Sequence, residues 1–214
     1  MTYPYTAGDA LFQVLRLLVL AGITKATSLG ILLWLPTSSS LITYLMIIVL
    51  SALQYAFFNM LVNHFMWTTY RCEALNAHDY SFLMEESANS HTIVGVGVFE
   101  KFEFESTKKY LLAKAADVHK CKSKLVKRFG VFWYQLMTEE EWKEAADYLV
   151  VEGPPIKSQQ ELRERACEAQ ANYEFYDKPQ FQFILIPDYI DNQSVIILKI
   201  HHSFTDGLGI ATFF

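Results

Sequence analysis

The first 70 residues of this chain contain almost no charge. Only Asp9, Arg16 and Lys25 carry one there, whereas the other 38 of the 41 acidic and basic residues follow position 70. This distribution excludes a uniformly soluble protein, a disordered chain and a multispan transporter. The sequence therefore divides into a hydrophobic membrane-anchoring region, residues 1–70, and a globular region, residues 71–214, that is long enough to bury one core.

Cysteine is also scarce. Cys72, Cys121 and Cys167 are far apart, odd in number and form no CxxC pair. This pattern excludes a disulfide framework and fits a reducing compartment, with each thiol structural or inert. The net charge of −5 and the absence of a Lys/Arg-rich tail predict that nucleic acid is not a partner.

A run of 22 residues without charge or proline, residues 41–62, predicts a transmembrane helix. At ~1.5 Å per residue such a helix is about 33 Å long, which is enough to cross a hydrocarbon core of about 30 Å. A buried core helix of this length would be apolar on every side, so we favour the membrane span.

A second apolar run, residues 10–35, contains Arg16 and Lys25. It is either a second span that closes a helical hairpin through residues 36–40 or an interfacial amphipathic helix over residues 10–24. The internal cations favour an interfacial or tilted element, because a charge at the bilayer centre costs about 2.5–3.5 kcal/mol. The few Lys and Arg residues that flank the runs do not fix an orientation.

The globular region alternates between strand-like and helix-like patterns, which predicts an α/β or α+β fold with a mixed sheet flanked by helices. Expected strands lie at 91–104, 148–151, 181–186 and 194–202, and residues 125–137 are expected to be extended around Gly130. Expected helix caps are Ser106 or Thr107 for residues 108–120, Thr138 with Glu141, and Ser158 with Glu161.

Eight basic residues lie between Lys108 and Arg128, against one acid, Asp117. A solvated helix face accounts for such a run, because charges on helices usually face water. Contact with anionic lipid or with a phosphorylated cofactor is the alternative. The sequence leaves both interpretations open.

Candidate chemistry is concentrated at the end of the last expected strand. Strand alternation places His202 on the apolar face of Ile196, Leu198 and Ile200, and His201 on the opposite face. A partly desolvated, neutral imidazole at this place suits a general base that acts on a hydroxyl. The alternatives are a buried structural histidine and, for Asp206-Gly207, a simple turn signal. We predict no metal site at His201, His202 and Asp206, because adjacent strand side chains diverge.

The segment HHSFTDG, residues 201–207, resembles the HHxxxDG motif of the CoA-dependent acyltransferase superfamily. Residues 74–83, with Asp79 followed three positions later by Phe82, resemble the start of the wax ester synthase/diacylglycerol acyltransferase family within it. Residues 179–186 resemble that family's segment before the histidine strand. The resemblance covers residues 74–214 and implies the N-terminal lobe of a two-lobe acyltransferase fold.

What the resemblance implies for the site is specific to four residues. His202 would be the general base that takes the proton from a diacylglycerol or long-chain alcohol hydroxyl as its oxygen attacks the acyl-CoA thioester. His201 would support the local geometry, Asp206 would hold and orient the loop, and Gly207 would permit a tight turn and close substrate approach. The co-substrate would be acyl-CoA, with no bound cofactor.

Only seven residues follow Gly207. Because the resembling enzymes have two lobes, we expect this chain to be the N-terminal part of a longer enzyme, inactive alone and completed by a C-terminal lobe. The alternative is a non-catalytic, membrane-anchored binding or interaction protein derived from the lobe. For the enzyme we expect the endoplasmic reticulum membrane, with the lobe facing the cytosol.

Overall fold

The computed structural model describes residues 7–34, 40–84, 91–171 and 177–205. The chain divides into two compact units. The helical unit extends to Glu73 and includes Lys127–Val131, and the globular unit comprises Ala74–Val126 and the chain from Phe132 onward.

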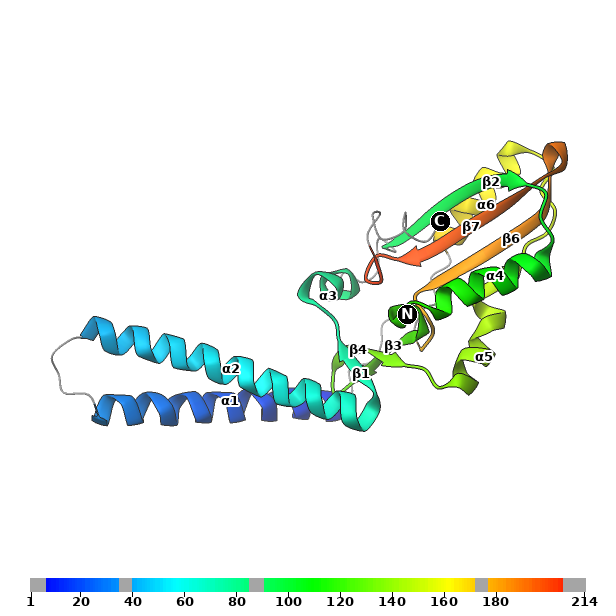
Figure 1. Ribbon diagram of the computed structural model, residues 1–214. Coiled ribbons are helices and arrows are strands. Elements are labelled where there is room, and N and C mark those ends of the chain that lie inside the picture. The colour runs from blue at the N-terminus through cyan, green and yellow to red at the C-terminus, as the bar shows by residue number, and fades with distance from the viewer. Residues whose placement is uncertain (1–6, 35–39, 85–90, 172–176, 206–214) are drawn as a thin grey trace. The chain divides into compact units, whose positions relative to one another are not determined.

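The helical unit consists of two long antiparallel helices, α1 (Ala7–Trp34) and α2 (Ser40–Tyr70) (Figure 1). α1 continues through Arg16 and Lys25 without a break, as the helical-hairpin alternative for residues 10–35 predicts. α2 is longer than predicted and runs to Tyr70 rather than ending near residue 62. Two polar contacts join them. The Arg16 guanidinium donates to the Asn59 side-chain oxygen at 2.7 Å, and the Gln54 amide donates to the Thr27 hydroxyl. The alternative of a helix limited to residues 10–24 is therefore wrong, because α1 is continuous from Ala7 to Trp34.

The globular unit is built on a four-stranded sheet in the order β2-β7-β6-β5 (Figure 1). Its strands are β2 (Thr92–Glu100), β7 (Gln193–His201), β6 (Phe181–Tyr189) and β5 (Val150–Glu152). β7 pairs antiparallel with both β2 and β6, whereas β5 pairs parallel with β6. The sheet is therefore mixed, as the sequence predicts.

Two hydrophobic clusters cover the two faces of this sheet. Ile196, Leu198 and Ile200 of β7 pack on the side of α4 (Phe104–Ala116), together with α5 (Glu139–Leu149). Val195 and Ile197 pack on the side of α6 (Gln159–Ala171). Because both faces are covered, eight consecutive residues of β7 are buried, which is why this strand is an almost continuous apolar run.

Three helix starts test the predicted caps. Thr138 and Glu141 form the complete capping box, so that prediction is confirmed. Ser158 accepts from the Glu161 amide, but the Glu161 carboxylate accepts from Lys157 instead of Ser158. The prediction for α4 is wrong, because Glu103 accepts from the Ser106 amide and starts the helix at Phe104.

The remaining elements include a second sheet of three strands in the order β1-β4-β3: β1 (Cys72–Ala74), β4 (Val131–Leu136) and β3 (Ser123–Arg128). A two-residue turn, Phe129-Gly130, joins β3 to β4 with positive φ at both residues, as a type I′ hairpin requires. The short elements are α3 (Ala77–Met84) and the 3₁₀ turns η1 (His119–Lys122) and η2 (Ile190–Asn192).

Two of the three thiols have the burial expected of structural cysteines. Cys72 and Cys121 are buried, whereas Cys167 is exposed, and none of the three forms a disulfide. Burial raises the pKa of the Cys121 thiol to about 12, which keeps it protonated and unreactive.

Candidate functional site

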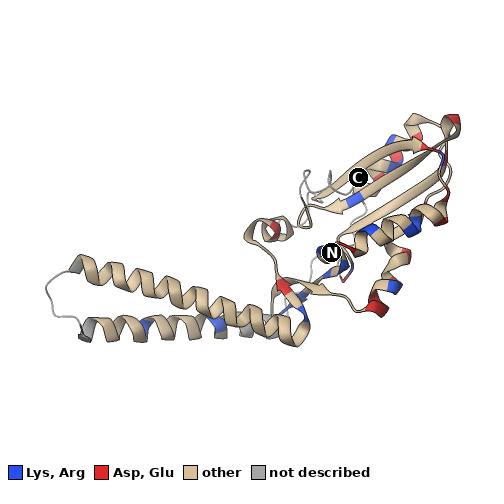
Figure 2. Ribbon diagram, viewed as in Figure 1, with Lys and Arg blue, Asp and Glu red and all other residues tan. Residues whose placement is uncertain are grey.

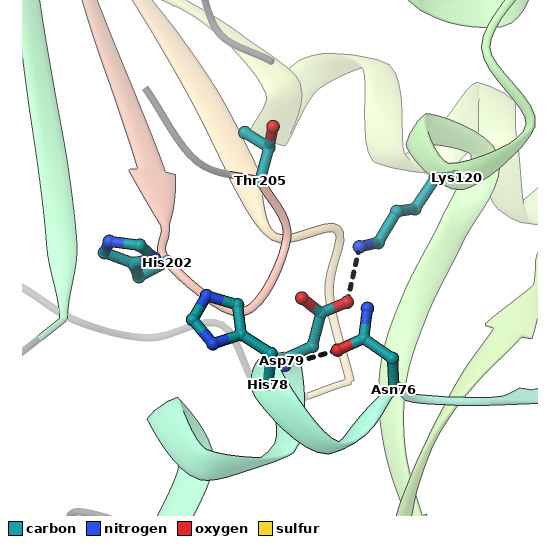
Figure 3. A pocket seen from close by; sticks show the side chains of 6 residues that line it. All are labelled: Asn76, His78, Asp79, Lys120, His202 and Thr205. Carbon is teal, nitrogen blue, oxygen red and sulfur yellow. Dashed lines mark hydrogen bonds and ion pairs between the residues drawn. The ribbon is translucent and has the colours of Figure 1, made fainter. Parts of the chain in front are cut away.

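A cavity of about 270 Å³ lies in the globular unit, next to the end of β7 (Figure 3). Three elements supply its walls: the start of α3, the turn η1 and the turn that follows β7. The lining side chains are all polar: Asn76, His78, Asp79, Lys120, His202 and Thr205. A pocket with this lining suits a hydrogen-bonding part of a substrate better than an aliphatic chain, which would leave the polar groups without partners.

His202 lies at the edge of this cavity (Figure 3). The prediction that it continues the inward face of the strand is wrong, because β7 ends at His201 and His202 is the first residue of the turn. Its amide donates to the His91 carbonyl at 2.7 Å, which fixes the backbone where β2 begins. Its half-buried ring stacks on Phe82, with 3.9 Å between centroids and 20° between planes. Within the described part of the chain, no hydrogen-bond partner reaches its buried Nδ1.

His201 has a different environment, although it is the adjacent residue. Its side chain is buried, and its Nδ1 accepts from the Ser203 amide at 3.2 Å and lies 2.6 Å from the Ser203 hydroxyl. Burial, with the neighbouring charges of His91 and His202, lowers the pKa of His201 to about 3. The His201 ring is therefore neutral at physiological pH and stabilises the turn through Ser203. The cavity borders His202 instead.

Lys120 joins three parts of the site. Its ammonium pairs with the Asp79 carboxylate at 2.9 Å and donates to the Ser203 carbonyl at 3.4 Å. It lies over the rings of Tyr134 and Phe204, at 4.8 and 5.4 Å from their centroids. The Tyr134 hydroxyl donates to the same Ser203 carbonyl at 2.7 Å. The Ser203 carbonyl, in the turn after β7, thus accepts hydrogen bonds from both the Lys120 ammonium and the Tyr134 hydroxyl.

Sequence reasoning missed five residues that line the cavity as site residues: Asn76, His78, Asp79, Lys120 and Thr205. The signal for Asn76 was present, because its side chain accepts from the Asp79 amide at 2.7 Å, an N-cap three residues ahead of an acid. His78 and Lys120 had no local signal, since only the fold brings the start of α3 and the turn η1 to the end of β7.

The basic run is not a free cationic surface. At least four of its eight residues form ion pairs: Lys108 with Asp147, Lys120 with Asp79, Lys122 with Glu139, and Lys124 with both Glu141 and Asp177. Figure 2 shows blue and red residues close together along this part of the globular unit. The run therefore serves mainly to join α4, η1 and β3 to acidic residues elsewhere in the unit.

Two of the predicted site residues, Asp206 and Gly207, lie outside the described residues. Ser203 is completely buried, which excludes it as an exposed nucleophile. Among the described residues, no three His, Cys, Asp or Glu side chains are grouped so that they would hold a metal ion.

Similar architectures occur among solved structures. The first condensation domain of the calcium-dependent antibiotic synthetase aligns with a TM-score of 0.54 and 14% identity, over 66% of this chain and 36% of that chain. The starter condensation domain of rhizomide synthetase aligns with a TM-score of 0.51 and 13% identity, over 71% of this chain and 35% of that chain. The chain has the CoA-dependent acyltransferase fold. The fold class predicted from the sequence is thereby confirmed.

A wax ester synthase/diacylglycerol acyltransferase from Marinobacter aquaeolei VT8 also aligns, with a TM-score of 0.49 and 18% identity. That alignment covers 65% of this chain and 35% of that chain. This chain spans about a third of the length of each of these solved structures. No family model matches the sequence, and no curated protein sequence matches it either.

Proposed function

We propose that this chain belongs to a membrane-anchored O-acyltransferase that moves a fatty acyl group from acyl-CoA to the hydroxyl of diacylglycerol or of a long-chain alcohol. The products would be triacylglycerol or a wax ester, and free CoA. The observation that carries the proposal is the position of His202. Its imidazole lines a polar cavity at the end of the central strand, in a chain with the acyltransferase fold.

In the proposed reaction His202 accepts the proton of the acceptor hydroxyl while that oxygen attacks the thioester carbonyl carbon. The C–O bond forms, the C–S bond breaks, and the leaving CoA sulfur takes the proton back from His202. No acyl-enzyme is formed, and no residue of this chain changes its oxidation state. We assign His201 a supporting role, Asp206 the orientation of the loop, and Gly207 the turn that admits substrate.

The helical unit supports membrane anchoring. Its two helices each contain a window long and apolar enough to cross a membrane, Gln13–Ile31 and Leu41–Tyr70. Their large apolar side chains point outward, for example Leu18 at 64%, Ile48 at 64% and Leu53 at 59% exposure. Figure 2 shows the helices almost free of charge. An apolar surface of this extent is stable in contact with hydrocarbon and costly in water.

Several polar side chains inside these helices find hydrogen-bond partners within the hairpin, as a membrane environment favours. Thr27 and Ser28 donate to carbonyls four residues earlier, and Gln54 donates to Thr27. The Arg16–Asn59 contact lies about 27–29 Å along the helices from their turn, at ~1.5 Å per residue, where a hydrocarbon core of about 30 Å ends. Lys25 is exposed, so its insertion into a membrane would cost free energy. The 30-residue apolar window of α2 would favour insertion and offset that cost.

We place the enzyme in the endoplasmic reticulum membrane with the globular unit toward the cytosol. Three cysteines without a disulfide fit that reducing side of the membrane. This orientation would bring His202 to the compartment in which water-soluble acyl-CoA meets a membrane-dissolved acceptor.

The test is ester synthesis by membranes from cells that express the complete reading frame containing this chain. Radiolabelled oleoyl-CoA is supplied with dioleoylglycerol or with hexadecanol, and products are separated by thin-layer chromatography. We expect acyl-CoA-dependent ester, and a loss of about 10²–10⁴-fold in the His202→Ala variant, the range for removing a general base. The exposed His119→Ala variant is the matched control. Absence of ester from both acceptors, or a wild-type rate in His202→Ala, would rule out the proposal and favour a non-catalytic binding protein.

A further inference from the structure

One short helix, α3, is linked to the turn after β7 in two ways, directly through Phe82 and indirectly through the ion pair of Asp79 with Lys120. Phe82 of α3 stacks on the His202 ring at a centroid distance of 3.9 Å. The edges of two more imidazoles meet the same phenyl ring, His78 at 4.9 Å and His91 at 5.3 Å. Phe82 is therefore the centre of an aromatic group that fixes the plane of the His202 ring.

The second contact lies one helical turn earlier. Asp79 precedes Phe82 by three residues, so the two side chains leave α3 on the same face. The Asp79 carboxylate holds the Lys120 ammonium, which in turn donates to the Ser203 carbonyl. Ser203 is the residue directly after His202, so this chain of contacts restrains the backbone that carries the histidine.

We propose that Asp79 and Phe82 are positioning residues for His202: Phe82 sets the orientation of its ring, and Asp79, acting through Lys120, sets the position of its backbone. The role in catalysis rests on the proposed function, whereas the holding of the ring does not. A side chain that reacts must stay within about 0.5 Å and 10–20° of its productive geometry, which a turn residue achieves only when neighbouring groups lock it.

The Phe82 contact and the Asp79 contact restrain different parts of His202, so their loss should have different effects. Without the Phe82 ring, the imidazole gains rotational freedom and solvent access while the backbone stays in place through the His91 carbonyl. Without the Asp79 charge, Lys120 loses its ion pair and its hold on the Ser203 carbonyl is weaker. We therefore expect Phe82 to affect His202 more than Asp79 does.

The experiment measures carbethoxylation of His202 by diethyl pyrocarbonate, followed by mass spectrometry, in the complete protein in detergent micelles. This readout needs no activity. We expect Phe82→Ala to raise the His202 modification rate at least five-fold and Phe82→Tyr to restore the wild-type rate. In parallel, kcat for ester synthesis should fall about 10–100-fold in Phe82→Ala, with KM changed less than three-fold.

Phe104→Ala is the matched control, because Phe104 is also a partly buried phenylalanine of the globular unit but is the first residue of α4 and packs on the core. It should leave the His202 modification rate unchanged. The Asp79 arm uses Asp79→Asn, Lys120→Met and the double variant, whose effects should be non-additive because both remove one contact chain.

Each result has one meaning. An unchanged His202 modification rate in Phe82→Ala, or an equal rise in Phe104→Ala, overturns the positioning role. Additive effects of the Asp79 and Lys120 variants overturn the proposed path to the turn. If Phe82→Ala exposes His202 but the wild-type protein makes no ester, the positioning role stands and the proposed function fails.

Discussion

α2 and β7 are both rich in apolar residues, and these residues have opposite environments in the two segments. β7 buries eight of its nine residues, because β2 and β6 flank it and helices cover both faces of its sheet. α2 has 31 residues, and the window that qualifies as a membrane span is 0% buried. The same kind of side chain is therefore covered by protein in one segment and left uncovered by it in the other. Hydrophobicity alone does not say which solvent a segment uses.

The largest expected effect comes from one charge placed in each segment. Ile197→Asp puts a carboxylate in the α6-side core, where a buried unpaired charge costs several kcal/mol, and we expect the globular unit not to fold. Ile48→Asp, its counterpart in α2, should leave the globular unit folded but weaken membrane retention. Limited proteolysis reports the first effect and alkaline carbonate extraction the second. Equal loss of protease resistance in both variants would contradict the comparison.

A smaller truncation sharpens the same contrast. Leu198→Ala removes a side chain that is 2% exposed, so we expect a loss of about 2–5 kcal/mol in the free energy of unfolding. Leu53→Ala removes a side chain that is 59% exposed and should change that free energy by less than about 0.5 kcal/mol. Guanidinium unfolding in detergent micelles, followed by tryptophan fluorescence, measures both values. A similar loss in the two variants would mean that α2 is packed against protein.

The pH dependence of the free energy of unfolding tests whether His201, at the end of β7, is buried and neutral in the folded state. The folded pKa of His201, about 3, is far below the unfolded value of about 6.5. Above pH 6.5 the ring is neutral in both states. As pH falls below 6.5, only the unfolded state takes up the proton, so stability decreases down to about pH 3. Between pH 6.5 and 5 the loss is on the order of 2 kcal/mol for this group.

The measurement is urea unfolding at pH 7 and pH 5 for the wild type and for His201→Gln. The variant should lose less stability over this interval than the wild type does. Equal losses would show that His201 titrates normally and is not buried as described.

The smallest expected effect concerns a helix cap at the surface of the globular unit. Thr138→Ala removes the side-chain acceptor of the capping box of α5, which should cost about 1 kcal/mol. Thr138→Ser keeps the acceptor and is the matched control. Thermal unfolding followed by circular dichroism should show a lower Tm for the alanine variant and an unchanged Tm for the serine variant.

The predictable features were those determined within a few residues. The capping box at Thr138 follows from local spacing, and the mixed α/β class follows from the alternation of strand-like and helix-like patterns. The start of α4 was not predictable in the same way. Ser106 and Thr107 are good caps, but Glu103 is the residue that accepts from the Ser106 amide, and the helix begins three residues before Thr107.

For the candidate site, the limit of sequence reasoning was the end of β7. Alternation places His201 and His202 on opposite faces, but it does not reveal that the strand ends between them. It also does not reveal that Phe82 and Asp79, more than 100 positions earlier in the sequence, hold the turn, since contacts across such separations leave no periodic signal.

The sequence alone determined that the chain has a charge-poor helical region and an α/β lobe with an HHxxxDG-like segment, because charge distribution, periodicity and a contiguous motif are properties of neighbouring residues. Only the tertiary structure decided which histidine is buried and which one borders the cavity. That distinction depends on where β2, α3 and η1 meet the end of β7, and therefore on burial and hydrogen bonds between segments that are distant in the sequence.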